Sequence, residues 1–412
     1  MKPSPAICKL SAMIKSNRAS VWFLAVLMLS VCMGCHFMST HFSHAATAHP
    51  DMNSCLVYIG TFTFKQSKGI YAVRMSPKTG ALGEPELVAE SQSPSYLALH
   101  PNGRFLYCVN EIDRFDGKRG GAVSAFSINL DSGRLTLLNQ APSGGVGPTH
   151  ISIDRRGMDV LVANYGSGSV AVLPVEADGK VAEPSSVDQH EGKGTDPARQ
   201  EGPHAHCANL DPSNRFALSA DLGLDKAFVY RFDAVAGTIT PNTPPAASIA
   251  PGSGPRHLAF DPAGKNVYVL NEMGATITAC HYDPAHGVLS EFQTISTVPE
   301  GFSGAKGSAE IMVHPSGRFL YASNRGDSND IAIFRIDSHS GQLTFVDRVS
   351  TQGKAPRGFG INPTGQWLLA ANQDTDNVIV FRIDQNTGKL TSTGTNLHVP
   401  TPVCIVFLTP KS

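Results

Sequence analysis

The chain has 412 residues, of which 41% are hydrophobic and 16% charged, and its formal net charge is −1 at pH 7. A chain of this length can bury a large core, and length alone would suggest about two or three domains. The near-neutral charge gives no whole-protein field that would attract nucleic acid or a membrane surface, so we expect no nucleic-acid partner.

The first 48 residues differ from the rest of the chain. A basic start is followed by an apolar run from Ala19 to Val31, and an Ala-x-Ala site stands at positions 46–48. This order is typical of an export signal, and the apolar run is short for a membrane span. We therefore expect residues 1–48 to be a leader and the protein to be periplasmic or secreted. Met-Gly-Cys at positions 33–35 leaves a lipid or N-terminal anchor open, which would be the protein's contact with a membrane.

One hairpin pattern recurs along the rest of the chain. It consists of a short apolar strand, a turn of the Asp-Pro-x-Gly kind and a second β-rich strand. Its copies begin at residues 94, 148, 205, 255, 308 and 356, so they are 54, 57, 50, 53 and 48 residues apart. A second hairpin signature, apolar-x-x-x-x-Gly-x-Leu/Val/Ile, follows each copy. Four strands in a repeat of about 45 residues are typical of one propeller blade.

The two ends of the repeat region complete each other. Residues 55–61 match a second strand with no first strand before it, and residues 401–407 match a first strand with nothing after it. Pairing the two ends closes a ring and protects the sheet edges. We predict an all-β, seven-bladed propeller with four antiparallel strands per blade, formed as a single domain by residues 55–408.

Two further features of the repeat region are informative. Residues 188–204 form a connection that is long for a compact domain, and such loops are often functional. Five cysteines follow the leader, scattered one per strand without a pairing pattern, and we expect them to be buried strand residues. They are Cys55, Cys108, Cys207, Cys280 and Cys404.

The repeat also assigns polar residues to two faces. The Asp-Pro-x-Gly turns lie on one face, where similar residues recur at one position and should hydrogen-bond within their turns. These residues are His100, Asp154, Asp211, Asp261, His314 and Asn362.

On the other face, the start of each first strand meets the end of each second strand, and the residues there vary from blade to blade. Arginine binds carboxylate or phosphate through a planar fork, and histidine and glutamate can move protons near neutral pH. The alternative is a set of Arg–Glu pairs that join neighbouring blades. His257 should point sideways between the blades and be structural, and His204-x-His206 is only a weak metal signal.

Several segments resemble the seven-bladed lactonase family, which includes the propeller-type 6-phosphogluconolactonase and the fungal carboxy-cis,cis-muconate cyclase. The resemblance covers essentially all of residues 55–408. It implies a seven-bladed ring, no required metal or other cofactor, and a site made of a His, an Arg, a Glu and a second Arg. The segments are Gly-Pro-Thr-His at 147–150, Gln-Glu-Gly-Pro-His-Ala-His at 200–206, Gly-Pro-Arg-His at 254–257, Ala-Glu-Ile at 309–311, Ser-Asn-Arg-Gly at 323–326 and Ala-Pro-Arg-Gly-Phe at 355–359.

By matching these motifs, the resemblance places the catalytic residues at His204 (or His206), Arg256, Glu272 and Arg325. The other residues of this face are expected to bind substrate. They are His150, His206, Glu310, Arg357, Glu111 and Gln373.

We therefore expect a hydrolase that opens a sugar-acid lactone, with 6-phosphogluconolactone as the default substrate of the family. Arg256, Arg325 and Arg357 would hold the anionic group and the developing oxyanion, and Glu272 or His204 would deprotonate the attacking water. The partner would be a small-molecule lactone or an anionic sugar acid, and the sequence leaves the oligomeric state open. The alternatives are a muconate-type cyclase and a non-catalytic exported propeller that binds a ligand or protein. Export would itself make a phosphorylated substrate rare.

Overall fold

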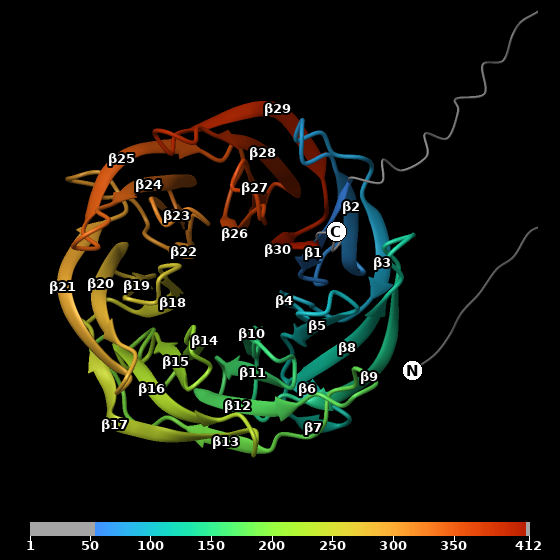
Figure 1. Cartoon of the computed structure of the whole chain (residues 1–412), viewed down its shortest axis with the longest axis vertical. Coiled ribbons are helices and arrows are strands. Elements are labelled where there is room, and N and C mark those ends of the chain that lie inside the picture. The colour runs from blue at the N-terminus through green and yellow to red at the C-terminus, as the bar shows by residue number, and fades with distance from the viewer. Residues whose placement is uncertain (1–53, 409–412) are drawn as a thin grey trace, which may run out of the picture. The chain divides into compact units, whose positions relative to one another are not determined.

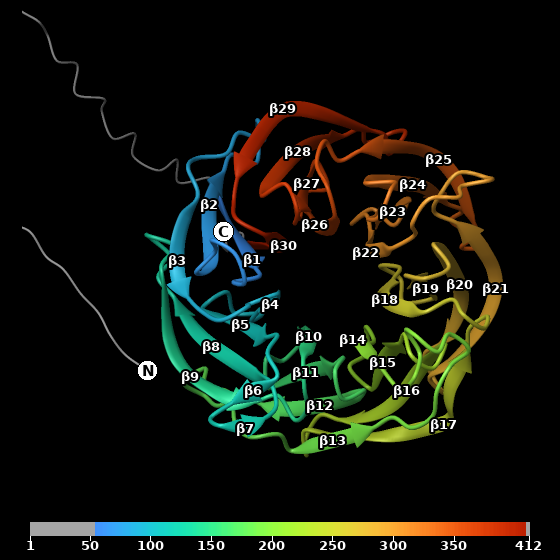
Figure 2. The same ribbon diagram turned by 180° about the vertical axis from the view of Figure 1, so that it is seen from behind.

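The computed structural model describes residues 54–408, and the regular structure in this range consists of β-strands. Seven four-stranded antiparallel sheets follow one another around a ring, as the numbering of the strands shows in Figure 1. Figure 2 shows the same ring from behind. The predicted seven-bladed, all-β fold is confirmed. The leader lies outside the described residues and stays a prediction.

The first four blades run from the N-terminal end of the described chain. Blade 1 contains β1 (Cys55–Thr61), β2 (Gly69–Met75), β3 (Glu86–Glu90) and β30 (Pro402–Leu408). Blade 2 contains β4 (Tyr96–Leu99), β5 (Phe105–Asn110), β8 (Ala122–Ile128) and β9 (Leu135–Pro142), with the small hairpin β6 (Arg114–Phe115) and β7 (Lys118–Arg119) inserted between β5 and β8. Blade 3 contains β10 (Pro148–Ile153), β11 (Asp159–Asn164), β12 (Ser169–Pro174) and β13 (Ser186–Gln189). Blade 4 contains β14 (Ala205–Leu210), β15 (Phe216–Asp221), β16 (Lys226–Asp233) and β17 (Thr238–Ser248).

The remaining three blades keep the same strand order. Blade 5 contains β18 (Pro255–Phe260), β19 (Asn266–Asn271), β20 (Thr276–Asp283) and β21 (Val288–Ser296). Blade 6 contains β22 (Ser308–Val313), β23 (Phe319–Asn324), β24 (Asp330–Ile336) and β25 (Leu343–Ser350). Blade 7 contains β26 (Pro356–Ile361), β27 (Trp367–Asn372), β28 (Asn377–Ile383) and β29 (Leu390–His398).

The ring is closed by the two ends of the repeat region. β1 pairs antiparallel with β30, from Leu56 opposite Leu408 to Gly60 opposite Cys404. A further backbone hydrogen bond, from Phe62 N to Thr401 O at 3.2 Å, continues the pairing beyond the strands. β30 therefore supplies the first strand of blade 1, as the sequence predicts.

Neighbouring blades are held together by apolar side chains and by a repeated hydrogen bond. The second strands β11, β15, β19, β23 and β27 are buried along their whole length, because a blade packs on each of their faces. The five cysteines that follow the leader are buried in strands of the propeller as free thiols. A second-strand tyrosine donates to the carbonyl of a positive-φ glycine in the next blade, as Tyr321 Oη does to Gly388 O at 2.8 Å. The other pairs of this kind are Tyr58 with Gly133, Tyr107 with Gly179 and Tyr268 with Gly341.

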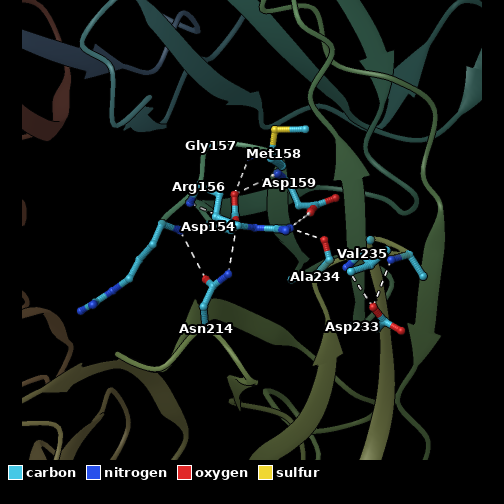
Figure 3. Close-up of polar contacts among 12 residues, drawn as sticks. Asp154, Arg156, Gly157, Met158, Asp159, Asn214, Asp233, Ala234 and Val235 are labelled. Carbon is cyan, nitrogen blue, oxygen red and sulfur yellow. Dashed lines mark hydrogen bonds and ion pairs between the residues drawn. The ribbon is translucent and has the colours of Figure 1, made fainter.

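On the turn face, the recurring polar residues hold their turns together. Asp154 Oδ1 accepts hydrogen bonds from Met158 N at 2.5 Å and Asp159 N at 3.1 Å (Figure 3). Asn214, which replaces glycine in the blade 4 turn, has a φ of 60° and donates through Nδ2 to Asp154 Oδ2 at 3.0 Å. The prediction of a structural role is confirmed for these turns, and the link from Asn214 shows that they also connect blades.

Candidate active site

The opposite face holds the polar residues that vary from blade to blade. Pro255 at the start of β18 pairs with Asn271 at the end of β19, so the first-strand starts and second-strand ends share this face. The pairing skips one residue at the same place in four blades, which is the register shift of a β-bulge. A bulge re-aims the side chain of the extra residue. The skipped residues are Thr149, His206, Arg256 and Arg357.

These residues line two adjoining hollows. The larger, the mouth cavity, has a volume of about 350 Å³, which falls within the range of small-molecule sites. It is lined by Glu111, Thr149, Tyr165, Arg199, His206, Glu272, Arg325 and Arg357. The smaller, the inner pocket, has a volume of about 10 Å³, close to what one water needs. It is lined by Ser95, Tyr96, Glu111, Thr149, Arg256, His257, Arg357 and Val403.

Glu272 is the carboxylate around which the arginines of the mouth cavity gather. Its Oε1 lies 2.8 Å from Arg199 Nη2, and its Oε2 lies 2.8 Å from Arg325 Nη2 and 2.9 Å from Arg256 Nε. The Arg256 contact is an ion pair without hydrogen-bond alignment, because Arg256 Nε has no hydrogen-bond partner among residues 54–408. Arg357 Nη2 lies 3.9 Å from Glu111 Oε1, which is a looser pair.

These contacts leave positive charge in excess. Burial would raise the pKa of Glu272, but Arg325, Arg256 and Arg199 together lower it to about 2. Burial, and then Arg325 and Arg357, lower the pKa of Arg256 to about 9. Four arginines and only two carboxylates, Glu272 and Glu111, line the two hollows, and a third carboxyl, that of Glu310, lies behind them near Arg256. Positive charge therefore exceeds negative charge around Glu272. Such a site favours an anion.

The two candidate histidines are placed differently. His206 lines the mouth cavity, and its buried Nδ1 has no hydrogen-bond partner within the described range. Burial, followed by the charges of Arg256 and His257, holds the pKa of His206 well below its usual range, so its ring is neutral at neutral pH. His204 does not line the cavity. Its ring stacks on Tyr165 at 4.4 Å, and its Nδ1 bonds to Tyr165 O at 3.0 Å.

Three of the residues expected to bind substrate lie outside the mouth cavity. Glu310 is buried behind the inner pocket, where its Oε1 lies 2.9 Å from His257 Nδ1 and its Oε2 accepts from Tyr96 Oη at 3.3 Å. Burial raises the pKa of Glu310 to about 7. The His150 ring lies 4.3 Å from the Tyr96 ring and is tilted against it by 33°, and Gln373 donates to Asp374 Oδ1 at 3.1 Å. His257, which was expected to be structural, both bonds to Glu310 and lines the inner pocket.

Sequence reasoning named five of the eight residues that line the mouth cavity as site residues and missed Thr149, Tyr165 and Arg199. Thr149 stands between Pro148 and His150 as Arg256 stands between Pro255 and His257, so the repeat itself carried the signal. Tyr165 directly follows the second strand β11, so the repeat places it on this face, but the residue type alone indicates no role. Arg199 lies in the long 188–204 connection, whose length was the signal.

Two negative findings complete the description. No group of three or more His, Cys, Asp or Glu residues between 54 and 408 is arranged to hold a metal ion. In the same part of the chain, no helix is long and apolar enough to cross a membrane.

Comparison with known proteins agrees with this architecture. The family described as "Lactonase, 7-bladed beta-propeller" matches residues 56–407. The chain is 40% identical to the 6-phosphogluconolactonase of Bacillus subtilis (strain 168) over 357 residues, which cover 87% of this chain and 99% of that protein. It is 34% identical over 326 residues to a 6-phosphogluconolactonase of Formosa agariphila, covering 77% of this chain and 89% of that one.

A solved structure adds a further relative. The periplasmic gluconolactonase of Pseudomonas aeruginosa, PpgL, superposes with a TM-score of 0.82 at 35% identity, covering 87% of this chain and 100% of that one. The chain therefore belongs to the seven-bladed β-propeller lactonase family, a family of lactone-hydrolysing enzymes.

Proposed function

We propose that the protein hydrolyses a sugar-acid lactone of the 6-phosphogluconolactone type in the mouth cavity. The observation that carries this proposal is the excess of positive charge around Glu272, where four arginines and two carboxylates line the two hollows. A lactone of a sugar acid develops negative charge at its carbonyl oxygen during hydrolysis, and its product is a carboxylate. Both anions suit a preorganised cluster of arginines.

The proposed reaction uses the residues of the two hollows. A water oxygen attacks the lactone carbonyl carbon, and the carbonyl oxygen becomes an oxyanion held by Arg256, Arg325 and Arg357. His206 accepts a proton from this water. The bond between the carbonyl carbon and the ring oxygen then breaks, and the ring oxygen takes the proton back from His206. The carboxylic acid that results loses its own proton to solvent.

In this proposal Glu272 holds the arginines in place and is not the base. Both carboxylate oxygens of Glu272 are already paired with arginines, Oε1 with Arg199 and Oε2 with Arg256 and Arg325, so neither is free to take a proton from water. His206 replaces both bases expected from the sequence, because it lines the cavity and has an unpartnered nitrogen, whereas His204 is committed to Tyr165.

The test compares two neighbouring histidines in a lactone-hydrolysis assay, with 6-phosphogluconolactone and glucono-1,5-lactone as substrates. His206→Gln should lower kcat by about a hundredfold or more, the usual contribution of a positioned base. His204→Gln, the matched control, should lower it far less. An unmodified protein that hydrolyses neither lactone would contradict the proposed reaction and leave ligand binding or a muconate-type cyclisation as the function.

We further propose that the protein is exported. The support is the leader-like order of residues 1–48 together with the periplasmic relative from Pseudomonas aeruginosa. N-terminal sequencing of the protein recovered outside the cytoplasm checks this, and a cytoplasmic chain that starts at Met1 would contradict it.

A further inference from the structure

The connection between β13 and β14 brings one arginine to the mouth cavity from outside the repeat. We call residues 190–204 the strap loop. It joins blade 3 to blade 4, and its Arg199 reaches Glu272, which follows β19 in blade 5. The other three arginines of the site belong to the propeller repeat, at a first-strand start or a second-strand end. Arg199 is therefore the one arginine of this site whose position depends on a loop.

The strap loop is anchored at both ends by one buried carboxylate. Asp221 Oδ2 lies 2.5 Å from His190 Nδ1, and Asp221 Oδ1 accepts from His204 N at 2.9 Å. His190 is buried, also bonds to Tyr230 Oη, and stacks on Phe228 at 3.8 Å. The two ends of the loop are thus held at a fixed distance on blade 4.

The residue next to Arg199 is fixed as well. The buried Gln200 accepts hydrogen bonds at Oε1 from Thr195 N and Asp196 N, both at 3.0 Å, and its Nε2 donates to Leu222 O at 2.8 Å. Ala198 N and Arg199 N both donate to Asp196 Oδ1. The backbone at Arg199 is therefore well held, so any movement of its guanidinium must come from the side chain, which contacts Glu272 and Tyr165.

Arg199 is also the most exposed arginine in the site. Its side chain is 44% exposed, against 3% for Arg256, 18% for Arg325 and 20% for Arg357. If Arg199 left Glu272, that carboxylate would keep two arginines on Oε2, so no buried charge would be stranded. If Arg256 or Arg325 left instead, Glu272 would keep one buried arginine and the more exposed Arg199. A movement of Arg256 would also require the bulged start of β18 to move.

We propose that Arg199 is the specificity-determining residue for a phosphorylated substrate, and that its guanidinium turns from Glu272 to the phosphate monoester of a sugar lactone. This inference rests on the proposed lactonase function. It concerns which lactone the site prefers and is independent of the proposed export, which would make a phosphorylated lactone a rare substrate. A planar guanidinium fork matches phosphate oxygens, and a dianionic phosphate outcompetes a carboxylate that is already paired twice. An unphosphorylated lactone offers Arg199 no comparable partner and leaves it on Glu272.

The experiment measures kcat/KM for 6-phosphogluconolactone and for glucono-1,5-lactone with the unmodified protein and with Arg199→Gln. The value for 6-phosphogluconolactone divided by the value for glucono-1,5-lactone should fall by about tenfold or more, because only the phosphorylated substrate loses a charged hydrogen-bond donor. The change should come mainly from a higher KM for 6-phosphogluconolactone. Lys193→Gln, which removes a positive charge from the same loop at an exposed lysine, should leave the ratio unchanged.

A second variant and a binding measurement separate the possible failures. Arg199→Lys keeps the charge without the fork and should give an intermediate ratio. Binding of the product 6-phosphogluconate, followed by calorimetry, should weaken in Arg199→Gln more than binding of gluconate. Equal losses for both substrates and both products would overturn the inference while leaving the lactonase function standing. An inactive unmodified protein whose product binding still shows the Arg199 preference would overturn the proposed reaction and keep the phosphate site.

Discussion

Arg256 is almost completely buried, yet it is surrounded by charges of its own sign. Glu272 contacts it at 2.9 Å, while Arg325 and Arg357 help to lower its pKa to about 9. A buried arginine in such surroundings is poorly explained as a device for stability, because the repulsion offsets much of the pairing. A group held ready for an anion explains it better.

Arg256→Ala separates these two roles. Glu272 would keep Arg199 and Arg325, so the melting temperature should change little, while lactone turnover should fall by about a hundredfold or more. The control is Arg348→Ala in the outer strand β25, which removes the ion-pair partner of the buried Asp330. Arg348 contacts Asp330, Thr297 and Phe345, none of which lines the mouth cavity, so its loss should destabilise the fold by about 1–3 kcal/mol with activity retained. A large loss of stability in Arg256→Ala with normal turnover per folded molecule would identify Arg256 as a link between blades.

The buried carboxyl of Glu310 leads to a second prediction, which concerns how the free energy of unfolding depends on pH. Its carboxyl is enclosed by Tyr96 from β4, His150 from β10, and Arg256 and His257 from β18. Burial raises its pKa from 4.5 to about 7, so the folded protein favours its neutral form. The resulting stability is fully present below pH 4.5 and is lost as the pH rises through 7. At about 1.4 kcal/mol per pKa unit, the change is on the order of 3 kcal/mol.

Glu310→Gln should remove this pH dependence. The amide can keep partners at Tyr96 and His257 but does not ionise, so the stability of the variant relative to the unmodified protein should rise between pH 4.5 and 7.5. Denaturant unfolding at several pH values measures it. Glu272 titrates in another window, because its lowered pKa gives stability above pH 4.5 that is lost toward pH 2. A constant difference between the two proteins across pH 4.5 to 7.5 would contradict the assignment.

Residues of the site could be predicted to a limited degree. Variation at fixed repeat positions placed Arg256, Glu272, Arg325 and Arg357 on one face together with other polar residues. The resemblance to the lactonase family then selected Arg256, Glu272 and Arg325 among them as catalytic. The choice between His204 and His206 could not be made, since both lie on one extended segment and a bulge decides which ring faces the cavity. Arg199 could not be placed, because the path of the strap loop depends on its anchors at Asp221.

At the scale of the elements, the glycine of the second hairpin signature has two duties. Gly388 has a φ of 75°, which glycine adopts without strain, and its carbonyl accepts from Tyr321 in blade 6. A Cβ at this position would also meet Phe319 Cδ1 at 2.5 Å. The pattern of glycines along the sequence was thus a correct sign of the hairpins. The contact with the preceding blade was not visible in it.

Gly388→Ala tests this double role against Gly394→Ala. Gly394 has a similar φ of 82°, but a Cβ there would meet nothing within 4 Å. Gly394→Ala should destabilise the protein by about 1–2 kcal/mol through backbone strain alone. Gly388→Ala should add about 1–3 kcal/mol of overpacking against the buried Phe319. Equal midpoints of urea unfolding for the two variants would show that the contact between the blades adds nothing.

For the molecule as a whole, the fold was predictable because the number of repeats and the two unmatched ends both indicate a closed ring of seven blades. Six full copies and two partial ones require a seventh blade built from both ends, and the pairing of β1 with β30 is that blade. The bulges that aim Thr149, His206, Arg256 and Arg357 were not predictable, because one extra residue in a strand leaves no mark without its partner strand. The fold therefore follows from repetition, which also places the site residues on one face. The direction of the four bulged side chains is seen only once the strands are paired.

The last prediction concerns closure of the ring. β30 supplies buried residues, among them Val403, Cys404 and Ile405, and contacts both β26 and β4 as well as β1. A chain that ends before Thr401 would leave β1 as an exposed, apolar sheet edge and would open the core on two sides. An edge of this kind pairs with other chains, so the truncated protein should aggregate or unfold. Thermal unfolding and light scattering measure this, with a chain that ends after Leu408 as the control. A truncated protein with an unchanged melting temperature would mean that β1, β2 and β3 need no fourth strand, and the ring would then not depend on its closing blade.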